Sequence, residues 1–413
     1  MLKLFLVNHN FRSYLLFQTF SSIGSGIFSI FLMWVVHSQF QNPFYTGVAG
    51  FMFAVSGIAS FIVGPFVDKH SKVILIRVVT LVQFGIVGLL YMFPDAFYAR
   101  VWFLLFAILI YDAALTVGSP AKTALLPTVV DGEDLVKANA LIRIIATVVG
   151  LGIGYFLYTT MAGSADFELV YMINTIILFI ALVMSIFLKS GTEPQKPESA
   201  ALKGYISELK VGFKFVKRGV VLHLILIFLL TGVFGSVAAV NLPAFAELHS
   251  GAASGYILLL ALGMVGGVLG SYVARFVGSK FELWKIFVIG LIATGITRII
   301  FVNIIANDFS RALRIVILYS ALGSIAGIFY GTLLQKLPPK NIIARVNAIN
   351  TSLFSIATSI GALLGGLAGT FISDVNNVFI MQGISYIIIG LGMLFSKHLR
   401  KLPKINDIVT DAS

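Results

Sequence analysis

The chain has 413 residues, of which 58% are hydrophobic and only 11% charged, with a formal net charge of +12. Soluble domains carry roughly 25% charged residues, so this composition excludes an ordinary water-soluble core. The absence of cysteine excludes disulfides, thiolate metal sites and cysteine nucleophiles. The six histidines are scattered, which argues against a zinc centre, and no cofactor is expected.

Apolar runs of around twenty residues follow one another along the chain. At a rise of 1.5 Å per residue, such a run crosses a hydrocarbon core of about 30 Å. The sequence therefore predicts an all-α integral membrane protein with twelve transmembrane helices. The expected ranges are 12–38, 44–65, 73–93, 101–119, 139–160, 167–188, 219–243, 254–277, 284–304, 313–334, 343–372 and 377–396.

The excess of basic residues follows the membrane topology and does not indicate a nucleic-acid surface. Lysines and arginines gather in alternate connections, which the positive-inside rule places in the cytoplasm. These connections are 66–72, 120–138, 189–218, 278–283, 335–342 and the C-terminal tail, and they include Lys122. The outward connections are richer in acids, namely Asp95, Asp166, Glu168, Asp308 and Asp374. We expect both termini in the cytoplasm and the chain in the plasma membrane, the inner membrane of a bacterium.

The connection 189–218 divides the chain near its middle. The expected organisation is an N-terminal six-helix bundle (1–188), a cytoplasmic linker (189–218), a C-terminal six-helix bundle (219–396) and a cytoplasmic tail (397–413). From Leu202, apolar residues recur at helical spacing opposite lysines. This pattern predicts a basic amphipathic helix on the inner leaflet. A solvated linker helix is the alternative.

Three sequence signals recur about half a chain apart, which indicates an internal repeat. Gly64 to Lys69 ends the second expected helix, and Gly270 to Arg275 ends the eighth, 206 positions later. Lys137 to Leu141 opens the fifth helix, and Arg345 to Ile349 opens the eleventh, 208 positions later. Leu-Pro pairs precede both openings, at Leu126-Pro127 and Leu337-Pro338, and small-residue runs follow both. Two pseudo-symmetric halves predict a substrate cavity between them.

These motifs resemble the major facilitator superfamily over essentially the whole chain. Gly64-x-x-x-Asp68-Lys69-x-x-Lys72 is similar to the signature between helices two and three of that superfamily. The macrolide and siderophore exporter branch, whose members resemble drug:proton antiporters, is suggested by three further stretches. They are Pro120 to Ala140, Tyr205 to Phe213 and Leu242-Pro243-Ala244-Phe245. The resemblance implies a secondary transporter of twelve helices whose cavity is lined by helices one, four, seven and ten.

Asp112 is the most informative single residue, because it is the only acid deep within an expected helix. A charge at that depth costs about 3 kcal/mol on insertion scales, and intramembrane acids are functional by default. The hypothesis is a proton carrier or an anchor for a cationic substrate, with Glu247 as a second proton site. The alternative is a structural acid that pairs with Arg143 or hydrogen-bonds to Tyr111 and Thr116.

The other candidate residues follow from the resemblance and from depth. Gly64, Asp68, Lys69 and Lys72 form the expected conformational switch, with a simple surface ion pair as the alternative. For Arg298, snorkelling of the side chain to an interface is the expected structure. For the candidate cavity residues Ser22 and Ser25, a role in close helix packing is the alternative. The candidate cavity residues are Gln18, Ser22, Ser25, Asp112, Arg143, Asn241 and Tyr330.

The predicted function is proton-coupled efflux of drugs or amphipathic small molecules by a monomer. A dedicated siderophore or metabolite exporter, an uptake permease and a lipid flippase remain alternatives. An enzyme is not expected, because no His, Asp, Glu or nucleophile cluster lies at one depth. No Gly-x-x-x-x-Gly-Lys-Ser/Thr loop for ATP is present either.

Overall fold

The computed structural model describes residues 8–130, 134–161, 166–189, 211–217, 219–305, 307–339 and 342–407. Most of the predicted linker, including the start of its amphipathic helix at Leu202, lies outside these residues. Some side chains within the helices, among them those of Asp68 and Arg143, also lie outside the description. The domain boundaries expected at 188 and 218 therefore remain predictions.

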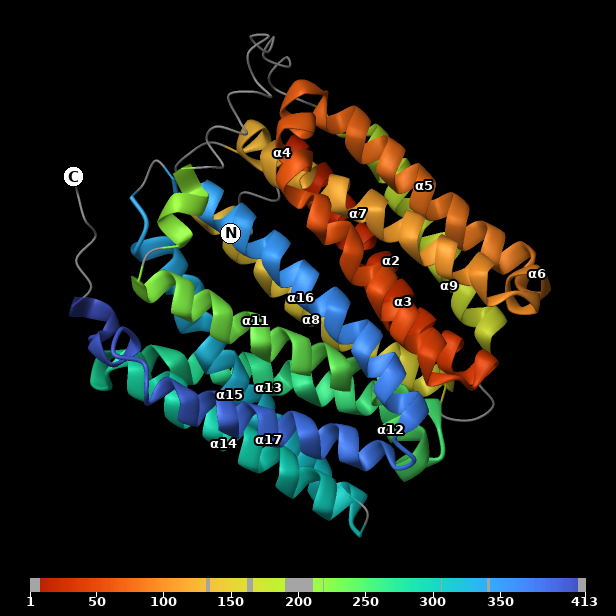
Figure 1. Cartoon of the computed structure of the whole chain (residues 1–413). Helices are drawn as coiled ribbons and strands as arrows, with labels where there is room; N and C mark the ends of the chain where they lie inside the picture. The colour runs from red at the N-terminus through yellow and green to blue at the C-terminus, as the bar shows by residue number, and fades with distance from the viewer. Residues whose placement is uncertain are drawn as a thin grey trace. The chain divides into compact units, whose positions relative to one another are not determined.

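The described helices fall into two units (Figure 1). The first unit comprises Met1–Gln41 and Val55–Leu202. In Figure 1, α2, α5, α7 and α9 lie alongside one another, which agrees with their mutual contacts. Its elements are α2 (His9–Phe40), η1 (Ser56–Ala59), α4 (Ser60–Lys69), α5 (Lys72–Met92), α6 (Pro94–Ala99), α7 (Val101–Val129), α8 (Leu135–Met161) and α9 (Phe167–Ile186).

The second unit comprises Asn42–Ala54 and Lys203–Ser413. It includes α3 (Pro43–Val55), where Gly47 allows close packing against α16: a Cβ at Gly47 would lie only 2.8 Å from Ala362 O. Its other elements are α11 (Gly219–Val240), α12 (Leu242–Ser250), α13 (Ala253–Lys280), α14 (Leu283–Ile305), α15 (Phe309–Lys336), α16 (Ile343–Phe371), α17 (Val375–Met393), η2 (Leu399–Lys401) and η3 (Ile405–Asp407).

Within the described residues, ten helices are long and apolar enough to cross a membrane. These helices are formed by the apolar runs. Inside lipid no water can pair with the backbone, and a helix is the structure in which one segment satisfies its own backbone polar groups. The membrane-spanning, all-helical character of the prediction is confirmed. The expected total of twelve spans stays a prediction.

Two expected helices are interrupted. The segment predicted as 44–65 consists of α3, the 3₁₀ turn η1 and α4, which runs to Lys69. The segment predicted as 219–243 ends at Val240, and α12 begins after Asn241, with Pro243 in its first turn. Pro is favoured in the first turn of a helix, because the backbone N–H that proline lacks would have no intrahelical partner there. The predicted ranges are helical, and the structure adds a 3₁₀ turn in the first and an end at Val240 in the second.

The fourth expected helix is longer than predicted. The predicted range ended at residue 119, and Lys122 was assigned to a cytoplasmic connection. In the structure α7 continues through Pro120 and Pro127 to Val129. Proline is tolerated in transmembrane helices because neighbouring groups satisfy the freed carbonyls. Lys122 is therefore a helical residue.

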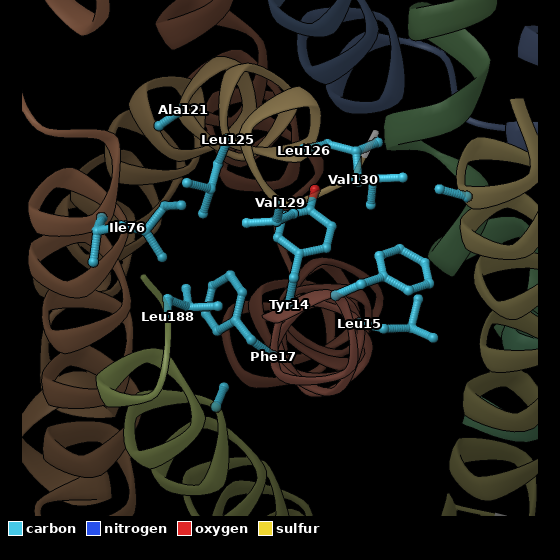
Figure 2. Packing of buried hydrophobic residues seen from close by; sticks show 14 of the residues in the cluster. Tyr14, Leu15, Phe17, Ile76, Ala121, Leu125, Leu126, Val129, Val130 and Leu188 are labelled. Atoms are coloured by element: carbon cyan, nitrogen blue, oxygen red, sulfur yellow. The ribbon is translucent and has the colours of Figure 1, made fainter. Parts of the chain in front are cut away.

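A buried apolar cluster holds one end of the first unit together (Figure 2). Tyr14 and Phe17 of α2 pack against Leu125 and Val129 of α7, and Ile76 of α5 joins them. Asn8 strengthens the same place, because its side chain accepts from Phe11 N and donates to Val129 O, each at 2.9 Å. This packing fixes the register of α2 against α7, the two helices that carry the first candidate site.

Candidate functional site

Asp112 lies in the middle of α7 and is half-buried. Its carboxyl group interacts with the side chain of Ser56, the first residue of η1. The Ser56 hydroxyl has no partner of ordinary hydrogen-bond geometry among the described residues, so this contact is a loose one. Among the described side chains, no cation pairs with Asp112. The interruption between α3 and α4 thus places a small polar group beside the embedded acid.

Tyr111 fixes the helix next to Asp112. Its ring is 1% exposed and stacks on Phe28 of α2, with ring centroids 3.7 Å apart and planes 9° from parallel. Its hydroxyl donates to Ser25 Oγ at 3.4 Å. The Tyr111 hydroxyl is thus engaged by Ser25, and the suggested Asp112–Tyr111 hydrogen bond is not formed. The stack sets the rotation of α7 and so the direction in which Asp112 projects.

Lys122 forms a second polar contact between α7 and α2 in the first unit. It is half-buried, and its Nζ donates to Ser21 Oγ at 3.4 Å. Nearby on α2, Gln18 Nε2 donates to Ser22 Oγ at 3.3 Å, while Gln18 Oε1 is buried with no partner among the described residues. Sequence reasoning missed Lys122 because the stretch 120–138 was assigned to a cytoplasmic connection.

In the second unit, Asn241 occupies the break between α11 and α12. Its Nδ2 donates to Val237 O at 2.9 Å and to Gly365 O at 2.8 Å, which satisfies carbonyls on two helices. Asn241 and Glu247 line one cavity of about 430 Å³. Glu247 follows the seventh expected helix and lies within α12.

Tyr330 is buried at a helix contact of the second unit. It stacks on Phe228 of α11, with centroids 3.8 Å apart and planes 11° from parallel. Its hydroxyl donates to Asn350 Oδ1 of α16. Both polar and apolar parts of Tyr330 are therefore engaged by the protein itself.

Arg298 of α14 contradicts the expectation that it snorkels to an interface. Its Nε donates to Gln382 Oε1 of α17 at 2.7 Å. The guanidinium carbon lies 4.2 Å from the ring centroid of Tyr319, 5.2 Å from that of Phe379 and 5.9 Å from that of Phe301. The side chain turns into the helix bundle because aromatic faces and an amide are available there. The position of a residue along an expected transmembrane helix does not reveal on which face of that helix it lies.

The residues of the predicted switch motif lie at the end of α4 and the start of α5. Lys69 is exposed, and Lys72 is half-buried. No described atom lies within 4 Å of a Cβ built on Gly64. The roles of Gly64, Lys69 and Lys72, and those of Asp68 and Arg143, stay predictions. In the described part of the chain, no three His, Asp or Glu side chains converge as metal ligands.

Comparison with known proteins identifies the family of this chain. Residues 14–362 match the Major Facilitator Superfamily. The uncharacterized MFS-type transporter YvqJ of Bacillus subtilis (strain 168) is 23% identical over 414 residues, covering 97% of this chain and 95% of YvqJ. The uncharacterized MFS-type transporter YkuC of the same organism is 25% identical, covering 94% of this chain and 90% of YkuC.

Solved transporter structures share the fold. A mutant of the nucleoside transporter NupG superposes with a TM-score of 0.76 at 12% identity, covering 93% of this chain and 100% of NupG. The POT family transporter PepTSo gives 0.73 at 11% identity, covering 95% of this chain and 98% of PepTSo. A bacterial homologue of the iron transporter ferroportin gives 0.70 at 17% identity, covering 94% and 98%. At these identities the likeness concerns the fold alone.

The family match covers most of the chain, and the described helices are long and apolar enough to cross a membrane. The chain therefore belongs to the Major Facilitator Superfamily, and it is a multi-pass membrane transporter of small molecules and not an enzyme.

Proposed function

We propose that this chain is a proton-coupled secondary transporter that exports drugs or other amphipathic small molecules, as macrolide-efflux proteins do. The observation that carries the proposal is Asp112, a half-buried acid in the middle of α7. No described cation neutralises it. An acid kept in such a place without a cation to neutralise it is expensive, and this cost favours a role in transport.

The proposed mechanism uses the proton equilibrium of the Asp112 carboxyl group. An apolar environment favours the neutral form of a carboxyl, and access to water favours the ionised form. A change in access between the two sides of the membrane would therefore make Asp112 take up and release one proton per cycle. Each charge that crosses gains about 2.3 kcal/mol per 100 mV of membrane potential. A tenfold concentration ratio corresponds to about 1.4 kcal/mol, so one proton can sustain a substrate gradient of one to two decades.

Neighbouring residues are assigned supporting roles. Tyr111 and Ser25 hold α7 against α2 and so orient Asp112. Glu247, which lines a cavity with Asn241, is a second-rank proton site. The remaining proposed substrate contacts are Gln18, Ser22, Arg143 and Tyr330. The Gly64, Asp68, Lys69 and Lys72 motif is proposed to act as the conformational switch.

The membrane arrangement that accompanies this function is also a proposal. Twelve helices would form two six-helix bundles, at 1–188 and 219–396, around a central cavity. The positive-inside distribution supports cytoplasmic termini in a bacterial inner membrane. A monomer suffices for such a transporter.

The test is the accumulation of a fluorescent cationic dye in cells that express the chain, with and without an uncoupler. We expect expression to lower accumulation and the uncoupler to abolish the difference. Asp112→Asn keeps the shape of the side chain and removes its proton site, so we expect at least a tenfold loss of the transport rate. Asp95→Asn is the matched control, because Asp95 is an exposed acid in α6.

The amounts of each variant in the membrane are measured alongside. Unchanged dye extrusion by Asp112→Asn at normal abundance would refute the coupling role of this residue. Uncoupler-sensitive accumulation, in place of extrusion, would identify an uptake permease. Reversal of lipid headgroups by the purified chain in vesicles, without dye transport, would identify a flippase.

A further inference from the structure

The guanidinium group of Arg298 is only partly used by the protein. Its Nε donates to the neutral Gln382 amide, and Nη1 is buried with no hydrogen-bond partner among the described residues. No described carboxylate pairs with it. A half-buried cation and a buried unsatisfied donor are each costly inside a membrane. The charge therefore lacks a counter-ion from the part of the chain that the structure describes.

The fold itself does not require a cation at this place. The repeat relates α17 to α9, and Asn174 of α9 precedes Gln382 by 208 positions, so both units have an amide there. The partner helix of the first unit, α5, carries Val87 and Leu90 in the corresponding part, both 0% exposed. In the first unit, apolar side chains therefore pack at the position that Arg298 occupies in the second unit. The arginine of the second unit needs a different explanation.

The surroundings of Arg298 select a particular chemistry. With Nε occupied, the edge formed by Nη1 and Nη2 remains, and this edge fits a carboxylate through two parallel hydrogen bonds. The rings of Tyr319, Phe379 and Phe301 lie around the guanidinium at 4.2, 5.2 and 5.9 Å. Flat walls favour a planar group over a tetrahedral one. The side chain as a whole is half-buried, so part of it remains accessible.

We propose that Arg298, with Gln382 and Tyr319, forms a binding site for a carboxylate group between α14, α15 and α17. The identification of that carboxylate as part of the transported molecule rests on the proposed function. The substrate would then be an amphipathic organic acid or a zwitterion. An anionic lipid headgroup offers similar chemistry through its phosphate, and the experiment separates the two sources.

The experiment measures binding of 4-fluorobenzoate to the purified chain in neutral detergent, by broadening of its ¹⁹F resonance at constant ionic strength. We expect saturable broadening in the wild type, competition by benzoate, and little competition by chloride. Arg298→Gln should weaken binding by roughly tenfold or more, because a charge-assisted bidentate contact is lost. Arg311→Gln is the matched control, since Arg311 is exposed and pairs with Asp308 at 2.9 Å.

Arg298→Lys keeps the charge but not the planar fork, and it should also bind more weakly than the wild type. This variant, together with the benzoate competition in the wild type, keeps the test decisive if Arg298→Gln does not fold. In lipid nanodiscs, displacement of 4-fluorobenzoate by phosphatidylglycerol but not by phosphatidylcholine would assign the site to a lipid headgroup and refute a substrate site.

Absence of saturable binding in the wild type would overturn the proposal. Equal binding by the wild type and a folded Arg298→Gln variant would overturn it as well. In both cases Arg298 would be a clamp between helices. Binding of 4-fluorobenzoate is measured in detergent without a proton gradient, whereas dye extrusion from cells depends on one. Failure of proton coupling at Asp112 and failure of carboxylate binding at Arg298 are therefore distinguishable.

Discussion

In the first unit α7 carries two charges among its described side chains, Asp112 and Lys122. In the second unit the equivalent helix is α15, where Ser320 and Tyr330 stand 208 positions later. The charge inside the second unit is instead Arg298, on α14. The two units thus carry acidic and basic groups on different helices, although their sequences repeat.

The scaffold of the two units is more alike than their charges. Asp166 and Asp374, which are 208 positions apart, both begin a helix by accepting a backbone hydrogen bond at 2.9 Å. Asn174 and Gln382 are related by the same offset, and both are buried. Residues that fold the bundle recur, whereas embedded charges belong to one unit only. This difference supports the proposal that the charges serve transport.

The largest expected difference in stability between the units lies at two repeated glycines. A Cβ at Gly270 would lie 2.8 Å from Ala321 Cα and even closer to the Ala321 carbonyl oxygen. Gly270→Ala must therefore separate α13 from α15, which we expect to cost about 2–3 kcal/mol. Gly64→Ala meets no described atom within 4 Å and should gain about 0.5–1 kcal/mol from helix propensity.

Thermal unfolding of the purified variants in one detergent measures both effects. Gly267→Ala is the control, because a Cβ at Gly267 on the same helix as Gly270 meets no described atom within 4 Å. Equal destabilisation by Gly64→Ala and Gly270→Ala would show that the two helix ends pack alike. The comparison between the units would then fail at this place.

Much of the fold could be predicted from the sequence, because a run of about twenty apolar residues has few alternatives to a spanning helix. Interruptions were harder to predict. Ser56 and Asn241 lie within apolar runs whose average hydropathy hides a local change of backbone. The fourth helix was predicted too short, whereas α7 continues through Pro120 and Pro127, which a membrane helix tolerates.

The candidate site was less predictable for a different reason. Asp112 could be identified from depth alone, since an embedded acid is rare. Lys122 was assigned to a cytoplasmic connection by the positive-inside rule. Arg298 was assigned to an interface, because long basic side chains usually reach one. Only the neighbours that each side chain meets, such as Ser21 and Gln382, reveal that it turns inward. Such contacts join residues about one hundred positions apart and leave no local pattern.

The repeated helix caps should give equal, intermediate effects. Asp166 accepts from Leu169 N at the start of α9, and Asp374 accepts from Asn376 N at the start of α17. Removing either cap by Asp166→Ala or Asp374→Ala should cost about 1 kcal/mol. Hydrogen–deuterium exchange of the first turn of each helix measures the local effect.

Glu168→Gln controls for loss of charge, since Glu168 is exposed in the first turn of α9. We expect faster exchange in the two Ala variants only. Faster exchange at the start of α9 in Asp166→Ala, without faster exchange at the start of α17 in Asp374→Ala, would show that the two caps are not equivalent. The structural repeat would then be limited to the order of the helices.

The smallest expected difference concerns pH at the start of two equivalent helices. In the first unit, α5 begins after Ser71, whose neutral hydroxyl accepts from Ile74 N. In the second, Glu282 precedes α14 and accepts from Lys285 Nζ at 2.9 Å and from Trp284 Nε1 at 3.0 Å. The hydrogen bond from Lys285, followed by that from Trp284, lowers the pKa of Glu282.

A lowered pKa fixes the sign of the effect. The stabilisation by Glu282 is fully present above the ordinary pKa of a glutamate, and it is lost as the pH falls through the lowered pKa of the folded state. Trp284 fluorescence reports on this contact in a variant whose other tryptophans, Trp34 and Trp102, are replaced by Phe. We expect an acid transition that Glu282→Gln abolishes and Glu168→Gln leaves in place. Because the groups are exposed, the change in global stability should be too small to detect. A fluorescence transition that persists in Glu282→Gln would assign it to another acid and remove this distinction between the two units.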